Sequence, residues 1–304
     1  SGRTYLYAAR DPRILVGPTH SAYLKIAEGC DRVCAFCAIP EIRGRFQSRS
    51  LASLEAEARQ LAAAGVRELN LVAQDSTSWG KDLQGRPRLD AVLRALDDVE
   101  GLDWIRLLYL YPSAVTDEVI AALASGRRVL PYVDVPLQHA SDAMLRAMKR
   151  GTTADRQRRL VERLRAGIPD VAIRTTFIVG FPGETDADFE ALCEFVREAR
   201  FDRVGVFRYS DEEGTAARDL PGKVSKRAAR ERQRALLDLL RELQAEKLAE
   251  LIGREVEVLV DAGGRDRAVA RMRSQAPDID GNVLLRGGAK TGDLLRARIT
   301  AVRG

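Results

Sequence analysis

The chain has 304 residues, of which 45% are hydrophobic, and its formal net charge is +5. This length exceeds one ordinary domain and supplies enough apolar residues for a large buried core. The small charge permits a nucleic-acid partner without indicating one. No apolar run approaches the ~20 residues of a membrane span, and the four unevenly spaced cysteines are not typical of a disulfide framework. We therefore expect a globular, cytoplasmic protein with no membrane association.

Short apolar runs alternate with helical patterns through most of the chain. The apolar runs predict strands over 22–27, 68–73, 104–110, 132–137, 171–180 and 201–208. The helical patterns predict helices over 51–61, 89–96, 117–124, 141–148 and 185–197. Such alternation builds parallel βαβ units, so we expect an α/β fold, either an incomplete barrel or an open doubly wound sheet. In both folds the working site lies at the carboxyl ends of the strands.

The pattern changes twice near the C-terminus. One long, charged helical segment extends over 225–251. After Gly253, short strand-like runs begin at Arg254, Ala268, Asn282 and Leu294, separated by glycine and aspartate. Short strands bounded by turn residues indicate a separate all-β unit of about 50 residues, built as a small barrel.

Three of the four cysteines, Cys30, Cys34 and Cys37, form a CxxxCxxC pattern directly after the first predicted strand. A disulfide would leave one thiol over. A zinc site usually takes four ligands, and only His20 is near in sequence. Three thiolates can instead hold an iron–sulfur cluster with one iron left open for a substrate or cofactor. We favour the cluster, while a structural metal remains the alternative.

The CxxxCxxC pattern, with the aromatic Phe36 before its last cysteine, resembles the radical S-adenosylmethionine (SAM) superfamily. The resemblance implies a [4Fe–4S] cluster held by the three cysteines. It also implies that the amino and carboxylate groups of SAM chelate the open iron, and that an electron from the cluster releases a 5′-deoxyadenosyl radical. In such enzymes the protein positions the radical and excludes water, while the cofactor supplies the chemistry.

Further segments resemble the methylthiotransferases of that superfamily. They are IPEIRGRFQSR at 39–49, MKRGTT at 148–153, RTTFIVGFPGET at 174–185, RYSDEEGTAA at 208–217 and RSQAPDIDG at 273–281. The resemblance implies a leader or linker remnant over 1–20, a radical SAM domain over 21–245 and a TRAM domain over 246–304. The expected fold is then a partial (β/α)6 TIM-like barrel followed by a small all-β TRAM barrel.

Two branches of the methylthiotransferases act on different substrates. YLKIAEGC, QDSTSWG, LLYLYPSAVTDEVI and VPLQHASDAML resemble the RimO branch, which modifies the β-carbon of an aspartate in ribosomal protein S twelve. The MiaB branch modifies adenosine in tRNA and more often has Ser-His-Pro where this chain has Leu110, Tyr111 and Pro112. We expect the RimO activity. The alternatives are tRNA adenosine methylthiolation and a non-catalytic, metal-containing protein that binds RNA or the ribosome.

Several residues besides the cysteines are candidates for SAM contacts. Phe36 lies beside Cys37, Gln138 and Ser141 follow the fourth strand, and the resemblance implies adenine contact near Ile178 and Gly180. Arg174 is a charge inside a strand, so it should pair either with the carboxylate of SAM or with an acidic side chain of a neighbouring strand. His139 is either a proton donor or a structural histidine.

The resemblance also concerns a further domain and a second cluster that methylthiotransferases contain. Methylthiotransferases carry an amino-terminal domain with three further cysteines and a second [4Fe–4S] cluster, and we expect that domain to be absent here. Ser1–Gly2 is typical of a cleaved tag. The remaining thiol, Cys193, lies on the apolar side of its predicted helix and should pack against the sheet. An electron donor and ribosomal protein S twelve are the expected partners, with the ribosome as a further one, and the chain should be a monomer.

Overall fold

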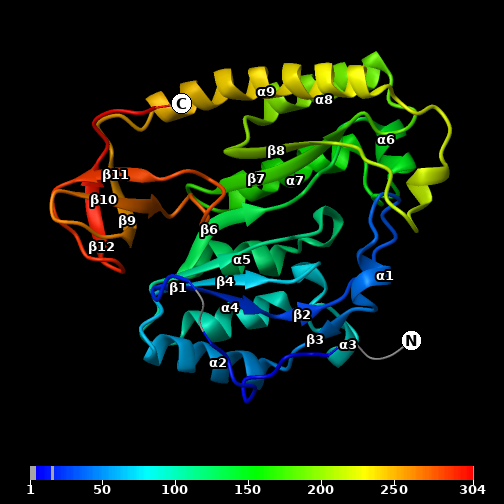
Figure 1. Ribbon diagram of the computed structural model, residues 1–304. Helices are drawn as coiled ribbons and strands as arrows, with labels where there is room; N and C mark the ends of the chain where they lie inside the picture. Colours follow the sequence, from blue (N-terminus) through cyan, green and yellow to red (C-terminus); the bar gives the residue numbers. More distant parts are fainter. Residues whose placement is uncertain (1–4, 15–16, 304) are drawn as a thin grey trace.

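The computed structural model describes residues 5–14 and 17–303, so the expected tag remnant, Ser1–Gly2, lies outside the described residues. Within these ranges one parallel sheet has the strand order β1-β4-β5-β6-β7-β8, with β1 and β8 at its two edges (Figure 1). The strands are β1 Ser21–Lys25, β4 Glu68–Val72, β5 Trp104–Leu107, β6 Val129–Asp134, β7 Ala172–Val179 and β8 Arg203–Arg208. The expected partial (β/α)6 barrel is confirmed.

Helices connect the strands, and the longer ones pack their apolar faces against the sheet in one large core. They are α1 Ile39–Arg43, α2 Leu51–Ala63, α3 Lys81–Gln84, α4 Leu89–Asp97, α5 Asp117–Ser125, α6 Asp142–Ala147, α7 Ala154–Gly167 and α8 Asp186–Ala199. Short 3-10 turns lie at Ser76–Ser78, Pro112–Ala114 and Ala216–Asp219, and β2 Ala27–Glu28 pairs with β3 Gln47–Ser48. Cys193 is buried in this core, as predicted.

Side-chain caps explain where several helices begin. Ser50, Thr116 and Thr153 each accept a hydrogen bond from a backbone N–H of the first turn. Thr185 forms a full capping box with Asp188, so helix α8 begins where the sequence predicts. Each cap satisfies a donor that the helix itself leaves unpaired.

Several elements differ from the sequence prediction. The short helices α1 and α3 and the strands β2 and β3 were not predicted, and β6 spans 129–134 where 132–137 was predicted. Helix α7 was not predicted, because only Leu160, Val161 and Leu164 form its buried apolar stripe in a segment rich in arginine. The strand predicted over 104–110 ends at Leu107. Tyr109 has a positive φ of 60°, which ends the extended backbone before the predicted limit.

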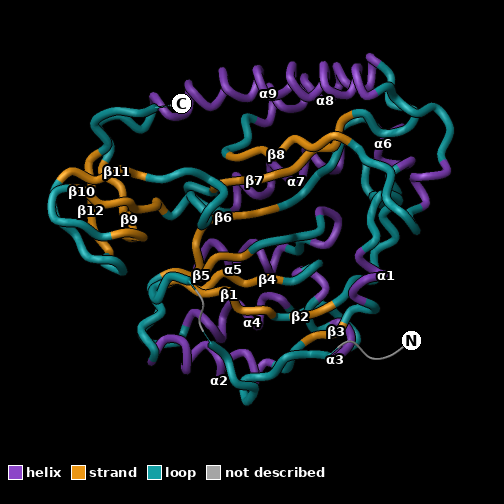
Figure 2. Tube along the Cα trace, in the orientation of Figure 1, coloured by secondary structure: helices purple, strands orange, loops and turns teal. Residues whose placement is uncertain are grey.

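The C-terminal part begins with helix α9, Lys226–Ala249, which leads from the barrel to a second sheet (Figure 2). In the described chain this antiparallel sheet has the order β11-β10-β9-β12. Its strands are β9 Glu255–Ala262, β10 Arg267–Met272, β11 Val283–Arg286 and β12 Leu294–Arg298. The predicted boundary at residue 245 falls within α9 and stays a prediction. Among the described helices, none combines the length and the apolar character required to cross a membrane.

Buried charges join the two sheets. Glu68 of β4 receives hydrogen bonds from Arg106 of β5, at 3.1 Å from Nη2, and from Arg271 of β10, at 2.6 Å from Nη2. Arg271 also pairs with Asp261 at 2.8 Å. All but Asp261 are nearly inaccessible to solvent. A buried carboxylate shared by two guanidiniums from different domains therefore fixes the C-terminal sheet against the amino-terminal side of the barrel.

Candidate active site

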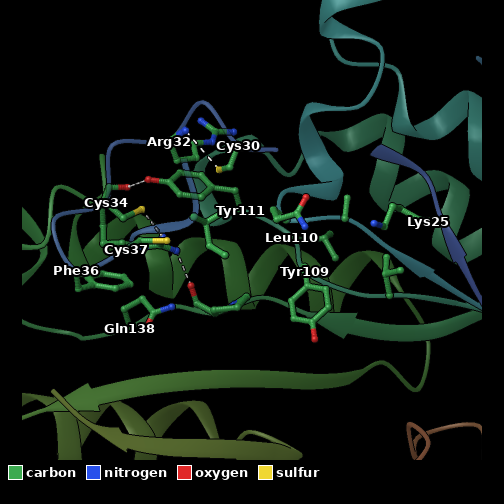
Figure 3. A pocket seen from close by; sticks show the side chains of 16 residues that line it. Lys25, Cys30, Arg32, Cys34, Phe36, Cys37, Tyr109, Leu110, Tyr111 and Gln138 are labelled. Carbon is green, nitrogen blue, oxygen red and sulfur yellow. Dashed lines mark hydrogen bonds between the residues drawn. The ribbon is translucent and has the colours of Figure 1, made fainter. Parts of the chain in front are cut away.

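A cavity of about 490 Å³ lies at the carboxyl ends of the barrel strands (Figure 3). Its walls come from the end of β1, from the segment that holds the three clustered cysteines, and from the loops after β4, β5 and β6. The lining residues are Lys25, Cys30, Arg32, Cys34, Phe36, Cys37, Ile39, Val72, Ala73, Gln74, Tyr109, Leu110, Tyr111, Pro136, Gln138 and Arg150. The cysteine sulfurs gather toward one end of this view, and Lys25 and Tyr109 lie toward the other.

Backbone contacts hold the cysteine segment against the barrel. Gly29 has a φ of 78°, and a Cβ there would lie 2.2 Å from the carbonyl oxygen of Arg45, so only glycine fits. The Cys30 amide donates to the Gly44 carbonyl at 3.1 Å, and the Ala35 amide donates to the Met148 carbonyl at 3.0 Å. The segment is therefore tied on both sides, which directs its thiols into the cavity.

The three thiols are free, and their donor chemistry fits an iron–sulfur cluster. Cys30 is buried, while Cys34 and Cys37 are half-buried. Burial raises the pKa of Cys30 to about 11 and also raises the pKa of Cys37, so both are protonated until a cation binds. Within the ranges that the structure describes, no three His, Cys, Asp or Glu side chains are gathered as the ligands of one single metal ion. Three soft sulfur donors on one cavity are nevertheless the ligand type of iron–sulfur clusters.

Two cavity arginines stack on Tyr111. The guanidinium carbon of Arg32 lies 3.9 Å from the ring centroid and that of Arg150 lies 4.4 Å from it. Arg32 pairs with Asp75 at 2.7 Å. Arg150 donates to the Cys34 sulfur at 3.2 Å and to the Pro136 carbonyl at 2.6 Å. Sequence reasoning assigned no role to either arginine; the one signal for Arg150 was its place in the MKRGTT segment.

Gln138 presents an unsatisfied polar atom to the cavity. Its backbone has a φ of 75° and bridges to β7, where its amide donates to the Thr176 carbonyl at 2.8 Å. Its side-chain oxygen Oε1 is buried and has no hydrogen-bond partner. A buried amide oxygen without a donor is costly, so a polar group of a bound cofactor would stabilise it. Of the predicted SAM contacts, Gln138 and Phe36 are those that line the cavity.

The other four predicted SAM contacts lie outside the cavity lining. The Ser141 hydroxyl donates to Asp188, and Ile178 packs in an apolar cluster with Phe36 and Phe181. Arg174 pairs with Asp134 of the neighbouring strand at 3.0 Å. An acidic side chain of a neighbouring strand was one of the two partners that the sequence indicated for Arg174. Arg174 lies five residues before the end of β7, or about 16 Å along the strand.

Gly180 is required by packing. It has a φ of 73°, and a Cβ there would lie 2.5 Å from Cβ of Ala229. Its amide donates to the Glu184 carboxylate at 2.5 Å, and the same carboxylate forms a hydrogen bond with Nε2 of His139 at 3.0 Å. His139 is thus a buried, hydrogen-bonded side chain. Contact of Ser141, Arg174, Ile178 or Gly180 with SAM stays a prediction.

Comparison with protein families agrees with this arrangement. Residues 24–196 match the model of the radical SAM superfamily, and residues 252–304 match that of the TRAM domain. Two solved structures share the fold. Coproporphyrinogen III oxidase (HemN) from Escherichia coli, a radical SAM enzyme, has a TM-score of 0.57 at 15% identity, over 84% of this chain and 67% of that one. The radical SAM methyltransferase TsrM from Kitasatospora setae has a TM-score of 0.52 at 21% identity, over 62% and 36%.

Curated relatives place the chain more narrowly. It is 51% identical to the ribosomal protein uS12 methylthiotransferase RimO of Sorangium cellulosum (strain So ce56), over 97% of this chain and 63% of the relative. It is 46% identical to the enzyme of the same name from Desulforamulus reducens, over 97% of this chain and 68% of the relative. The chain thus spans about two thirds of the length of these relatives. These matches show that the chain belongs to the radical SAM superfamily and, within it, to the family of ribosomal protein uS12 methylthiotransferases.

Proposed function

We propose that the chain is the SAM-cleaving part of a methylthiotransferase whose substrate is an aspartate of ribosomal protein S twelve. The observation that carries this proposal is the set of three thiols that open into the cavity at the carboxyl ends of the strands. The relatives named for this substrate support the choice of target. The chain spans 63% of the length of the first of these relatives and 68% of the length of the second.

The residues of the chain would divide the work in the cavity. Cys30, Cys34 and Cys37 would hold a [4Fe–4S] cluster by three thiolates. When bound together with SAM, that group supplies the 5′-deoxyadenosyl radical that takes a hydrogen from the β-carbon of the aspartate. Oε1 of Gln138 would accept a hydrogen bond from a polar group of SAM, and Phe36 would pack beside the bound SAM.

The apolar part of the wall would exclude water from the radical. Ile39, Val72, Ala73 and Leu110 line the cavity with apolar side chains. A radical exposed to water and mobile side chains would be lost to side reactions, so a dry wall favours transfer from the aspartate. Tyr109 is 46% exposed and would meet the target protein as it enters.

The first experiment tests the cluster. The chain is reconstituted anaerobically, and iron, sulfide and 5′-deoxyadenosine are measured. About four iron atoms per chain are expected for one cluster. Cys34→Ala should lose the brown absorbance and the 5′-deoxyadenosine, whereas Cys193→Ala is the matched control because that thiol is buried in the core, away from the cavity. Retention of both signals by Cys34→Ala contradicts the assignment.

The second experiment tests the target. The full-length protein is incubated with SAM, a reductant and either ribosomal protein S twelve or tRNA, and both are analysed by mass spectrometry. A methylthio group on the protein alone is expected. Modified adenosine in tRNA would instead assign the other branch of the family. We expect the full-length protein to bind iron for two clusters and this chain to bind iron for one. In the cell, a cytoplasmic electron donor would replace the chemical reductant.

A further inference from the structure

Arg150 is a buried cation that differs from the other buried arginines. In the described ranges, four arginines are almost wholly inaccessible to solvent: Arg49, Arg106, Arg150 and Arg271. Arg49 pairs with Glu57 at 2.6 Å. Arg106 and Arg271 both pair with Glu68. Arg150 is 5% exposed and has no carboxylate within ion-pair distance among the described residues. Because an unpaired buried guanidinium is costly, this position indicates that an anion is to be bound there.

The guanidinium of Arg150 faces the cysteine cavity. Nη1 donates to the Cys34 sulfur at 3.2 Å, and Nη2 donates to the Pro136 carbonyl at 2.6 Å. The third donor, Nε, is buried and has no partner. One nitrogen therefore contacts sulfur, one anchors the group to the loop after β6, and one is free for the group that the cavity binds.

Tyr111 fixes this guanidinium before any cofactor binds. The Tyr111 hydroxyl donates to the Arg150 carbonyl at 2.5 Å, and the ring contacts the guanidinium face. The turn that carries Arg150 has positive φ values at Lys149 and Gly151, so its backbone is set by the turn as well. A cation held at both its backbone and its side chain is preorganised and does not reorganise when charge appears beside it.

We propose that Arg150 is a positioning residue that tunes the reduction of the cluster through its N–H···S contact with Cys34. This inference rests on the proposed [4Fe–4S] cluster. An external one-electron donor reduces the cluster, so one negative charge is added while no bond to the protein forms or breaks. A fixed cation stabilises the more negative state, and hydrogen bonds to cluster sulfurs raise the reduction potential.

Arg32 provides a matched control. It stacks on the same Tyr111 ring, but Asp75 neutralises its charge. Within the described ranges the backbone amide of Arg32, and not its side chain, donates to a cysteine sulfur, that of Cys30 at 3.4 Å. Replacing it removes a cavity arginine without removing an unpaired cation. The two arginines therefore separate the effect of charge at sulfur from the effect of losing an aromatic contact.

The test is an anaerobic redox titration without SAM, read by electron paramagnetic resonance of the reduced cluster, on the reconstituted chain. In Arg150→Gln the reduced-to-oxidised ratio at a fixed potential should fall about tenfold, which is 59 mV for a one-electron couple. Arg150→Lys keeps the charge but loses the fork that reaches sulfur and carbonyl together, so a fall of roughly threefold is expected. Arg32→Gln should change the ratio less than twofold.

Other outcomes overturn the inference. An Arg150→Gln protein with full iron content and the original potential shows that the contact does not tune the cluster. If that potential is unchanged while SAM binding weakens, Arg150 belongs to the SAM site instead. Should Arg150→Gln fail to bind iron, Arg150→Lys decides, because an original potential there makes Arg150 structural only. If the unsubstituted chain holds no cluster, the proposed function fails, which is a separate result.

Discussion

Glu68→Gln tests whether buried charge joins the two domains. The Glu68 side chain is fully buried, and so is that of its partner Arg106, while the Arg271 side chain is 3% exposed. Glutamine has nearly the same shape, so the change removes the charge and leaves the packing. Arg271 would keep Asp261 as a partner. Arg106 would keep the Arg273 carbonyl and the ring of Tyr132, but no carboxylate.

The cost follows from what Arg106 loses. Removing one member of a buried ion pair typically destabilises a protein by about 3–5 kcal/mol, because the remaining charge is left in a medium of low dielectric. We expect a loss in that range. Burial raises the pKa of Glu68, but Arg106 and Arg271 outweigh it, so its folded pKa lies below the ordinary value. The stabilisation is therefore complete above about pH 5 and is lost as pH falls below the unfolded value of about 4.3.

Urea unfolding followed by tryptophan fluorescence measures the loss. The chain has two tryptophans. In a Trp79→Phe background the remaining Trp104 reports on the domain contact, because its indole nitrogen donates to Glu257 of β9 at 3.1 Å. Glu198→Gln is the control, since its pair with Arg158 is exposed and should contribute less than about 0.5 kcal/mol. A Glu68→Gln loss no larger than the control, or one that is independent of pH between 3 and 7, would refute the reasoning.

Three further substitutions address other parts of the molecule. Asp280→Asn should cost about 1–3 kcal/mol and expose the 273–281 loop to limited proteolysis, because Asp280 accepts from the Tyr132 hydroxyl at 2.5 Å and from the Ala276 amide at 2.9 Å. Thr185→Ala should cost about 1 kcal/mol by thermal unfolding, through loss of the α8 cap. Gly180→Ala should cost more than about 1 kcal/mol, since the added Cβ strains a left-handed backbone and meets Ala229; unchanged melting temperatures would contradict these three expectations.

The fold could be predicted where local chemistry decides it. Gly65, with a φ of 96°, follows the end of α2, and Thr185 begins α8, as their residue types indicate. The end of β5 could not be predicted, because it depends on residues that are distant in the chain. The Ser76 hydroxyl donates to the Leu108 carbonyl, and the Tyr109 amide donates to the Asp134 carboxylate. Apolar periodicity continues past Leu107, but the extended backbone does not, because Tyr109 has a φ of 60°.

The site shows the same division between local and long-range causes. The cysteine spacing is local, and the sequence placed all three thiols at the correct end of the sheet. Arg150 lies 116 residues from Cys34, so no spacing rule connects them. Arg174 was correctly placed in a strand as a charge that needs a partner, but sequence gives the face of a strand position more readily than its depth in the barrel. That depth puts it beside Asp134 and Asp280.

Arg174 and Asp134 show how the C-terminal domain supports the cavity. Asp280 of that domain lies 3.6 Å from Arg174, which pairs with Asp134 at 3.0 Å. Asp134 in turn accepts from the Tyr109 amide at 3.1 Å through its side chain and from the Leu110 amide at 2.8 Å through its carbonyl. The positive φ of Tyr109 is costly, and these two bonds from one buried residue stabilise it. The turn that forms the cavity wall therefore depends on a continuous series of contacts that begins in the second domain, which explains why a charged residue lies within β7.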